Sequence, residues 1–291
     1  MTADPTTTSE TTPPAAPRPA RKPRVQRMLK VVRTEQLTPH MVRVVLGGEQ
    51  FGDIEFKADT DQYIKLLFAD PALELSRPYD METLREQLAP ELMPVTRTYT
   101  IRHIDWENRQ IWVDFVIHGD QGIAGPWAAH AQPGDVISFF GPGSGYSPRP
   151  EADFHLIAGD ESALPAISAA LEGLGEQARG AVVLEVRDSS EEVPLSVPPG
   201  VELTWLHRGE FTPESAALAE YLQALEIPAG DVQVFIHGER EQMKLIRRLL
   251  VEQRGLPRKG MSLSAYWAYG RVEDQFQAEK RTPLGRIDPE A

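Results

Sequence analysis

The sequence predicts a β-barrel plus α/β fold, in which an antiparallel barrel is followed by a domain built on a parallel sheet. Two observations carry this prediction. Residues 25–150 contain short segments rich in β-branched and aromatic side chains between turn signals, whereas strand and helix patterns alternate after Pro150. Antiparallel strands can follow one another through short turns, but parallel strands need a crossover, usually a helix. The 291 residues are enough for both domains.

The barrel half is justified by the pattern inside its segments. In 110–118, Ile111, Val113 and Phe115 alternate with Trp112 and Asp114, a period of two that buries one face. Several such strands in succession are typical of an antiparallel barrel. We expect its strands at 25–33, 41–46, 62–68, 96–104, 110–118 and 135–141.

The second half is justified by strands that alternate with helix patterns. Strands are expected at 154–158, 181–186, 201–206, 232–237 and 261–267, with helices at 163–174, 215–225 and 239–252. The domains are therefore expected as a disordered tail at 1–24, the barrel at 25–150, the α/β domain at 151–267 and a C-terminal extension at 268–291, helical at 272–280.

Composition excludes several kinds of protein. There is no cysteine, so disulfides, thiolate catalysis and cysteine-held iron–sulfur clusters are ruled out, and redox chemistry must come from a bound cofactor. A formal net charge of −13 argues against broad nucleic-acid binding. The seven histidines are scattered, so no protein-held metal is expected. The longest apolar runs fall far short of the roughly 20 residues that cross a bilayer, and no secretory signal precedes them, which favours a cytoplasmic protein.

The segment Arg97-Thr98-Tyr99-Thr100 resembles the flavin signature of the ferredoxin-reductase superfamily, arginine-x-tyrosine-serine/threonine. Strand alternation places Arg97 and Tyr99 on one face. There the guanidinium can neutralise the pyrophosphate of FAD, while the phenol packs against the flavin. Thr100 points the other way, with its backbone and hydroxyl within reach of flavin N5. The alternative is an ordinary barrel strand with an exposed arginine and a half-buried tyrosine.

A glycine-rich segment, 118–127, follows the strand that carries Asp114. Glycines let backbone N–H groups approach phosphate oxygens, and a following helix adds a favourable dipole. The segment resembles the form found in siderophore-interacting proteins, which implies flavin contacts from Asp114, His118, Ala124, Gly125 and Trp127. Pro126 stands where that family often has serine. A hairpin loop without a ligand is the alternative.

The turn 158–166 directly follows a buried strand and opens a helix, at the place where parallel sheets bind ligands. It lacks the G-x-G-x-x-G fingerprint and resembles the siderophore-interacting variant, glycine-aspartate-glutamate-serine/threonine-alanine-x-proline. The implied nicotinamide-nucleotide contacts are Gly159, Asp160, Ser162, Ala163 and Pro165. A plain strand-to-helix turn capped by serine would look similar.

Two further segments extend the resemblance to the C-terminal strands. His237, at the end of 232–237, stands where the superfamily has a cysteine beside the nicotinamide. Tyr266 and Trp267 belong to a tyrosine-tryptophan-x-tyrosine-glycine segment like that of the family. One of these two rings is expected to face the core and the other to cover the flavin edge, against the alternative that both are core aromatics.

The resemblance implies an NAD(P)H-dependent ferric-siderophore reductase that holds FAD and releases iron by reduction, without an assigned catalytic residue. The acidic end of 184–188 favours NADH, which is the preferred of the two nucleotides, whereas Arg187 and Arg208 could receive the phosphate of NADPH, and a ferredoxin is a further possible donor. A general flavin or quinone reductase and a non-catalytic siderophore-binding protein stay open as alternatives. Anionic ferric siderophores predict basic contacts, for which the candidates are Lys65, Arg247 and Lys259, with Arg102 and Arg271.

Overall fold

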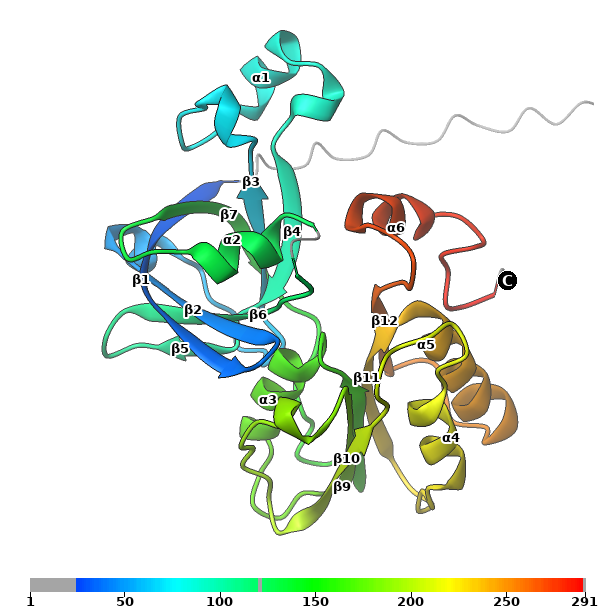
Figure 1. Cartoon of the computed structure of the whole chain (residues 1–291). Coiled ribbons are helices and arrows are strands. Elements are labelled where there is room, and N and C mark those ends of the chain that lie inside the picture. Colours follow the sequence, from blue (N-terminus) through cyan, green and yellow to red (C-terminus); the bar gives the residue numbers. More distant parts are fainter. Residues whose placement is uncertain (1–24, 120–121, 290–291) are drawn as a thin grey trace, which may run out of the picture.

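The computed structural model describes residues 25–119 and 122–289; residues 1–24, 120–121 and 290–291, among them the expected N-terminal tail, lie outside the described residues. It contains a seven-stranded and a five-stranded sheet. Pairing in the first is antiparallel throughout and in the second parallel throughout. Figure 1 shows the two sheets in separate bodies that meet where the chain passes from the first to the second. The predicted fold class is confirmed.

The first sheet has the strand order β4-β3-β7-β1-β2-β6-β5. Inward-facing side chains, among them Leu66, Phe115 and Phe139, are fully buried and form one core cluster. This burial follows from the alternation of apolar side chains along each strand. The strands are β1 (Gln26–Thr38), β2 (Met41–Gly47), β3 (Tyr63–Phe68), β4 (Val95–Thr100), β5 (His103–Asp105), β6 (Gln110–Val116) and β7 (Val136–Gly143).

The barrel is closed by the segment that the sequence predicts as one strand at 96–104. The structure divides it in two: β4 pairs with β3, and β5 pairs with β6. At the crossing, the Ile101 N–H donates to the Gln62 carbonyl at 2.7 Å, and the Arg102 N–H donates to the Trp112 carbonyl at 2.8 Å. The chain therefore changes partner within two residues, which joins the two edges of the sheet.

One excursion is not anticipated by the sequence analysis. Between β3 and β4 the chain forms the short helix α1 (Met81–Gln87), whose first turn is capped by the Asp80 carboxylate. Tyr79 and Leu84 pack with Leu67 in a small separate cluster at the end of β3. Figure 1 shows this helix projecting from the barrel, away from the parallel sheet.

The second sheet has the order β10-β9-β8-β11-β12, built from β8 (Phe154–Asp160), β9 (Arg179–Val186), β10 (Gly200–His207), β11 (Val232–Glu239) and β12 (Ser262–Trp267). The order reverses between β8 and β11, so the ends of these strands mark the switch point at which such sheets bind ligands. The helices are α3 (Leu164–Glu172), α4 (Ala217–Ala224) and α5 (Arg240–Arg247), with a π-helical turn, Arg248–Gln253, completing the helix expected at 239–252.

The two bodies are joined by polar contacts. The Glu191 carboxylate accepts hydrogen bonds from the Thr38 hydroxyl and from His40 Nδ1, each at 2.5 Å. Arg102 bonds Glu172 of α3 at 2.6 Å. After β12, helix α6 (Glu273–Glu279) turns back toward β4 of the barrel (Figure 1). Within the described residues, none of the helices combines the length and apolar character that crossing a bilayer requires.

Candidate functional site

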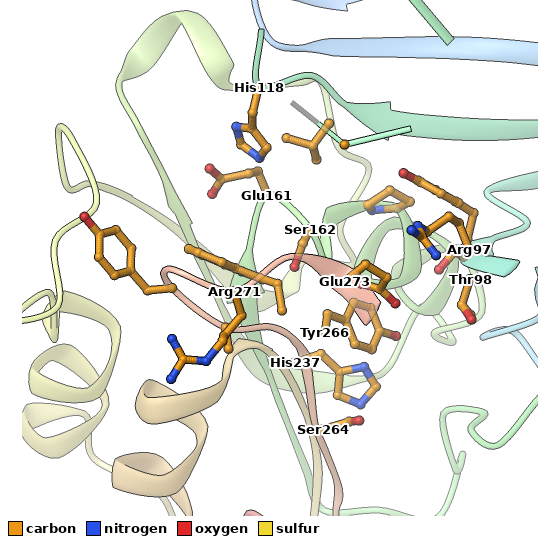
Figure 2. Close-up of a pocket in the computed structure, with 18 of the residues that line it drawn as sticks. Arg97, Thr98, His118, Glu161, Ser162, His237, Ser264, Tyr266, Arg271 and Glu273 are labelled. Atoms are coloured by element: carbon orange, nitrogen blue, oxygen red, sulfur yellow. The ribbon is translucent and has the colours of Figure 1, made fainter. Parts of the chain in front are cut away.

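A cavity of about 1270 Å³ lies where the barrel, the switch point and the C-terminal extension meet. Its wall is built from β3, β4 and β6, from the residues after β8 and β10, from β11 and β12, and from α6. Figure 2 shows labelled side chains from both sheets around one opening, with Arg97 and Thr98 from β4 and His237, Ser264 and Tyr266 from β11 and β12. Drug-sized ligands occupy roughly 300–1,000 Å³, so this space can take more than one ligand group.

The barrel side of the cavity carries the residues of the flavin-like strand. Arg97, Tyr99 and Thr100 all line it. The Tyr99 ring packs on Phe115 with 4.3 Å between centroids, and burial raises the pKa of its phenol above the usual range. Asp114 also lines the cavity, but both of its carboxylate oxygens accept from Arg43 at 2.7 and 2.8 Å. The charge of the Asp114 carboxylate is therefore already balanced by the Arg43 guanidinium.

The side chain of Arg97 is held by a residue of the C-terminal extension. Its two terminal nitrogens donate to the two carboxylate oxygens of Asp274 in α6, at 2.9 and 3.0 Å. The Arg97 side chain is 11% exposed and that of Asp274 64% exposed. A carboxylate thus occupies the two-pronged donor face of Arg97, which equally suits a phosphate.

The glycine-rich segment reaches the cavity only at its first part. His118 and Gly122 line the wall, whereas Asp120 and Gln121 lie outside the described residues. Ala124, Gly125 and Trp127 belong to the short helix α2 (Ala124–His130) and are absent from the cavity wall. Trp127 packs on the barrel core, with ring centroids 5.6 Å from both Phe68 and Phe115. Trp127 therefore supports the barrel core, and none of the three residues faces the cavity.

The turn after β8 is shaped by close packing. A Cβ on Gly159 would lie 2.4 Å from the His237 carbonyl oxygen, so glycine is required where β8 and β11 run side by side. Ser162 and Pro165 line the cavity, whereas Gly159, Asp160 and Ala163 lie behind it.

Asp160 ties this turn to β12. It accepts from the Ser162 N–H at 2.9 Å and from Trp267 Nε1 at 2.7 Å. Only 2% of Asp160 is exposed, and burial together with the charge of Glu161 raises its pKa to about 7. The carboxyl group therefore acts as an internal brace for Ser162 and Trp267.

His237 is fixed in a stack of aromatic rings. Its imidazole lies 4.2 Å from the Phe235 ring and 4.7 Å from the Tyr266 ring, measured between centroids, and its Nε2 bonds the Ser262 hydroxyl at 2.9 Å. Burial, with a smaller effect of Lys280, lowers the pKa of His237 to about 3. The imidazole is therefore neutral at physiological pH, and its Nδ1 has no partner among the described residues.

Tyr266 and Trp267 both line the cavity, although they are consecutive in β12. Tyr266 also packs against the core of the parallel-sheet domain, as expected for one of the two rings, but both rings reach the cavity. The ladder between β11 and β12 slips at the end of the strand, where Glu239 pairs with Trp267. Trp267 turns toward Phe211, with 4.8 Å between ring centroids. Such an irregularity re-aims a side chain that regular alternation would place on the other face.

The basic candidates divide into two groups. Lys65 and Arg271 line the cavity, and so does Lys280, the residue that follows α6, which was not among the sequence candidates. Burial lowers the pKa of Lys280; the charge of Glu273 opposes this shift and that of Lys65 adds to it. The other three candidates lie outside the cavity wall: Arg102 pairs with Glu172, Arg247 pairs with Glu252 and Asp288, and Lys259 is exposed.

Several wall residues were not assigned a contact by the sequence. Glu161 and Arg208 form a two-pronged ion pair, with Arg208 7% exposed. Glu161 lies inside the 158–166 turn, so its position was readable from sequence, but its partner was not. Phe211 and Glu273 were not singled out as contacts, and Tyr269 is the second tyrosine of the tyrosine-tryptophan-x-tyrosine-glycine segment. Across residues 25–119 and 122–289, the structure shows no group of three or more His, Cys, Asp or Glu side chains that could hold a metal ion.

Comparison with known proteins bears on this arrangement. A family model described as the siderophore-interacting FAD-binding domain matches residues 30–146, and one described as siderophore-interacting protein matches residues 152–270. The ferric vibriobactin reductase ViuB of Vibrio cholerae is 34% identical over 262 residues, covering 89% of this chain and 95% of that protein. The chain belongs to the siderophore-interacting protein family.

Other siderophore-interacting and related proteins agree in sequence. An uncharacterized protein of Mycobacterium tuberculosis is 44% identical over 265 residues, covering 87% of this chain and 93% of that protein. The NADPH-dependent ferric-chelate reductase of Escherichia coli is 30% identical over 247 residues, covering 83% and 92%. Because these alignments span both sheets, the relatives share the whole arrangement and not one half of it.

Solved structures agree with the fold. The crystal structure of a siderophore utilization protein from T. fusca matches with a TM-score of 0.74 at 35% identity, covering 86% of this chain and 95% of that one. A ferredoxin reductase of carbazole 1,9a-dioxygenase matches with a TM-score of 0.62 at 14% identity, covering 84% and 70%, a likeness of fold alone. This siderophore-interacting protein therefore has the ferredoxin-reductase-like fold that its sequence predicts.

Proposed function

We propose that this protein uses bound FAD and a reduced nicotinamide nucleotide, in the cytoplasm, to reduce ferric siderophore and release ferrous iron. The observation that carries the proposal is that one cavity is lined by residues of both sheets. It brings Arg97 and Tyr99 of the barrel face to face with Ser162, His237 and the end of β12. In a flavin reductase the flavin and the nicotinamide must meet, and here the two predicted half-sites share one space.

The cavity wall suits FAD on an observation independent of any relative. The carboxylate of Asp274 sits on the two terminal nitrogens of Arg97 and stands in for a pair of phosphate oxygens. Arg97 thus lines the cavity and can hold an anion with both of its terminal nitrogens. The Tyr99 ring, packed on Phe115, supplies a rigid flat surface beside these donors. Arg97, Tyr99, Thr100 and His118 would hold the flavin nucleotide.

In the proposed mechanism the residues of the cavity wall bind the two nucleotides, orient them toward each other and exclude water from the space between them. FAD held by these residues would supply the link between a two-electron nicotinamide donor and a ferric ion that takes one electron. His237 takes no part as an acid, because its lowered pKa keeps it neutral. The role of His237 is to place an uncharged imidazole ring, held between the rings of Tyr266 and Phe235, beside the nicotinamide. Asp160 holds Trp267 and Ser162 in register across the switch point.

The substrate end of the cavity is proposed at Lys65, Arg271 and Lys280. These cations line the wall at the barrel edge and on the C-terminal extension. A net charge of −13 would repel an anionic ferric siderophore in general, so local cations are needed to attract it. Release of iron follows from reduction, because oxygen donors hold the ferric ion more tightly than the ferrous ion.

The direct test begins with purified protein. An absorbance spectrum and mass spectrometry of the released flavin should identify FAD. Anaerobic addition of NADPH or NADH should bleach the flavin, and a ferric hydroxamate should then restore the oxidised spectrum while a ferrous-specific chelator develops colour. Protein that binds ferric siderophore but no flavin would point instead to a binding protein. Turnover of free flavin or quinone without ferric siderophore turnover would indicate a general reductase.

A further inference from the structure

We propose that Arg187 recognises the 2′-phosphate of the electron donor, so that the protein selects a 2′-phosphorylated adenosine nucleotide, NADPH, over NADH. This inference rests on the proposed function, since it concerns the donor for the same cavity. It goes beyond that function because it names the residue that distinguishes two donors which differ only by one phosphate.

The position of Arg187 is fixed by the backbone at the end of β9. The Arg208 N–H donates to the Val186 carbonyl at 3.0 Å, and the Gly209 N–H donates to the Arg187 carbonyl at 2.9 Å. These bonds continue the parallel ladder of β9 and β10 beyond the last strand residues. Arg187, Gly209 and Glu210 consequently line the cavity together. In doubly wound sheets, the end of the second strand is where the adenosine ribose is read.

Neither carboxylate flanking Arg187 is placed to bind a free ribose hydroxyl. Glu185 is 0% exposed and accepts from the Leu218 N–H at 2.9 Å and from Gln242 Nε2 at 3.1 Å. Asp188 is used locally, accepting from the Ser190 N–H at 2.9 Å and from the Ser190 hydroxyl at 2.6 Å. Glu185 and Asp188 are both absent from the cavity wall. The acidic contact that would favour NADH is therefore not formed by either.

Arg187 keeps a guanidinium that can change partner. Its side chain is 44% exposed, and it pairs with Glu210, which is 75% exposed, and more distantly with Asp188 at 3.9 Å. Exposed ion pairs contribute little to stability, so a phosphate can replace Glu210 at small cost. A phosphate monoester offers up to two negative charges and three acceptor oxygens, which suit the guanidinium fork.

Arg208, the other arginine near this place, is committed elsewhere. Its terminal nitrogens hold Glu161, its Nε lies 3.8 Å from Glu185, and its side chain is only 7% exposed. Withdrawing it would leave two carboxylates without their cation. Its guanidinium also lies 5.4 Å from the centroid of the Phe211 ring. Arg208 thus shapes this end of the cavity, and Arg187 is left as the cation that meets the nucleotide.

The experiment compares two nucleotides without requiring turnover. Adenosine 2′,5′-bisphosphate and 5′-AMP are titrated into flavin-loaded wild-type protein by calorimetry. The 2′-phosphate should tighten binding by about 10- to 100-fold, as one charge-assisted contact gives. Arg187→Gln should remove that advantage and leave 5′-AMP binding unchanged. Arg179→Gln, at the opposite, exposed end of the same strand, should keep the wild-type preference.

Each result decides. Equal affinity of the wild type for the two nucleotides overturns the inference, and so does an undiminished preference in Arg187→Gln. If both NADPH and NADH reduce the bound flavin and Arg187→Gln still prefers adenosine 2′,5′-bisphosphate over 5′-AMP, this inference is wrong and the proposed reductase function stands. A 2′-phosphate preference that depends on Arg187, in protein whose flavin no nicotinamide reduces, would support the binding site and defeat the proposed reductase function.

Discussion

Arg97 in β4 and Asp274 in α6 form a two-pronged ion pair across 177 residues of sequence, with N–O distances of 2.9 and 3.0 Å. The pair connects the barrel to the C-terminal extension at Arg97, a residue of the cavity wall. It also gives the arginine expected to bind flavin pyrophosphate an anionic partner from its own chain. The first two predictions follow from this relationship.

Arg97→Ala should weaken FAD binding by about 10- to 100-fold, since a charge-assisted hydrogen bond contributes roughly 1.5–3 kcal/mol. The fold should persist, because the Tyr99 ring and the barrel core do not depend on the guanidinium. Flavin titration of apoprotein, followed by fluorescence quenching, measures the change. Arg33→Ala is the matched control, a half-exposed barrel arginine outside the cavity wall. Unchanged FAD affinity in Arg97→Ala would remove Arg97 from the flavin site.

Asp274→Asn should tighten FAD binding by a few fold. The carboxylate competes with phosphate for the same two nitrogens of Arg97, and two anions repel each other there. The amide keeps the size of the side chain and removes the charge. In an Arg97→Ala background the same substitution should have no effect, which a double-mutant cycle measures. Weaker FAD binding in Asp274→Asn would show instead that Asp274 orients Arg97 for the phosphate.

Asp160 should make the protein less stable as the pH rises. Burial raises its pKa in the folded protein to about 7, against about 3.9 in the unfolded chain. The protonated form is thus favoured by folding, and its contribution is fully present below about pH 4 and lost as the pH rises through about 7. Melting temperatures of wild type and Asp160→Asn from about pH 4 to pH 8 measure the difference. The stability advantage of wild type over the variant should shrink with rising pH; a constant offset would contradict the assignment.

Lys65→Gln and Lys280→Gln should each raise the KM for an anionic ferric siderophore by roughly 3- to 10-fold at low ionic strength, with kcat largely kept. The effect should diminish as salt is added, because screening weakens the attraction. Lys259→Gln is the comparison, since that lysine is exposed and lies outside the cavity wall. If Lys259→Gln raises KM while Lys65→Gln and Lys280→Gln do not, the substrate enters elsewhere.

The predicted fold rested on local patterns, and those patterns were sufficient. Alternation in 110–118 and the strand-helix succession after Pro150 depend on residues close together in sequence, so periodicity reveals them. The division of 96–104 into β4 and β5 was not readable, because either strand partner satisfies the same side-chain pattern. Only the closure of the barrel decides where the chain leaves β3 for β6.

For the site, the sequence by itself determined which segments resemble binding motifs, and so predicted Arg97, Tyr99, Ser162, His237 and Tyr266 as ligand contacts, because motifs are local in sequence. The tertiary structure alone decided which side chains meet the cavity. It joined Asp274 to Arg97, buried Glu185 and left Arg187 at the wall. The physical reason is that burial and ion pairing depend on how distant segments pack, and charged side chains of one type are alike in sequence whether packing buries, pairs or exposes them.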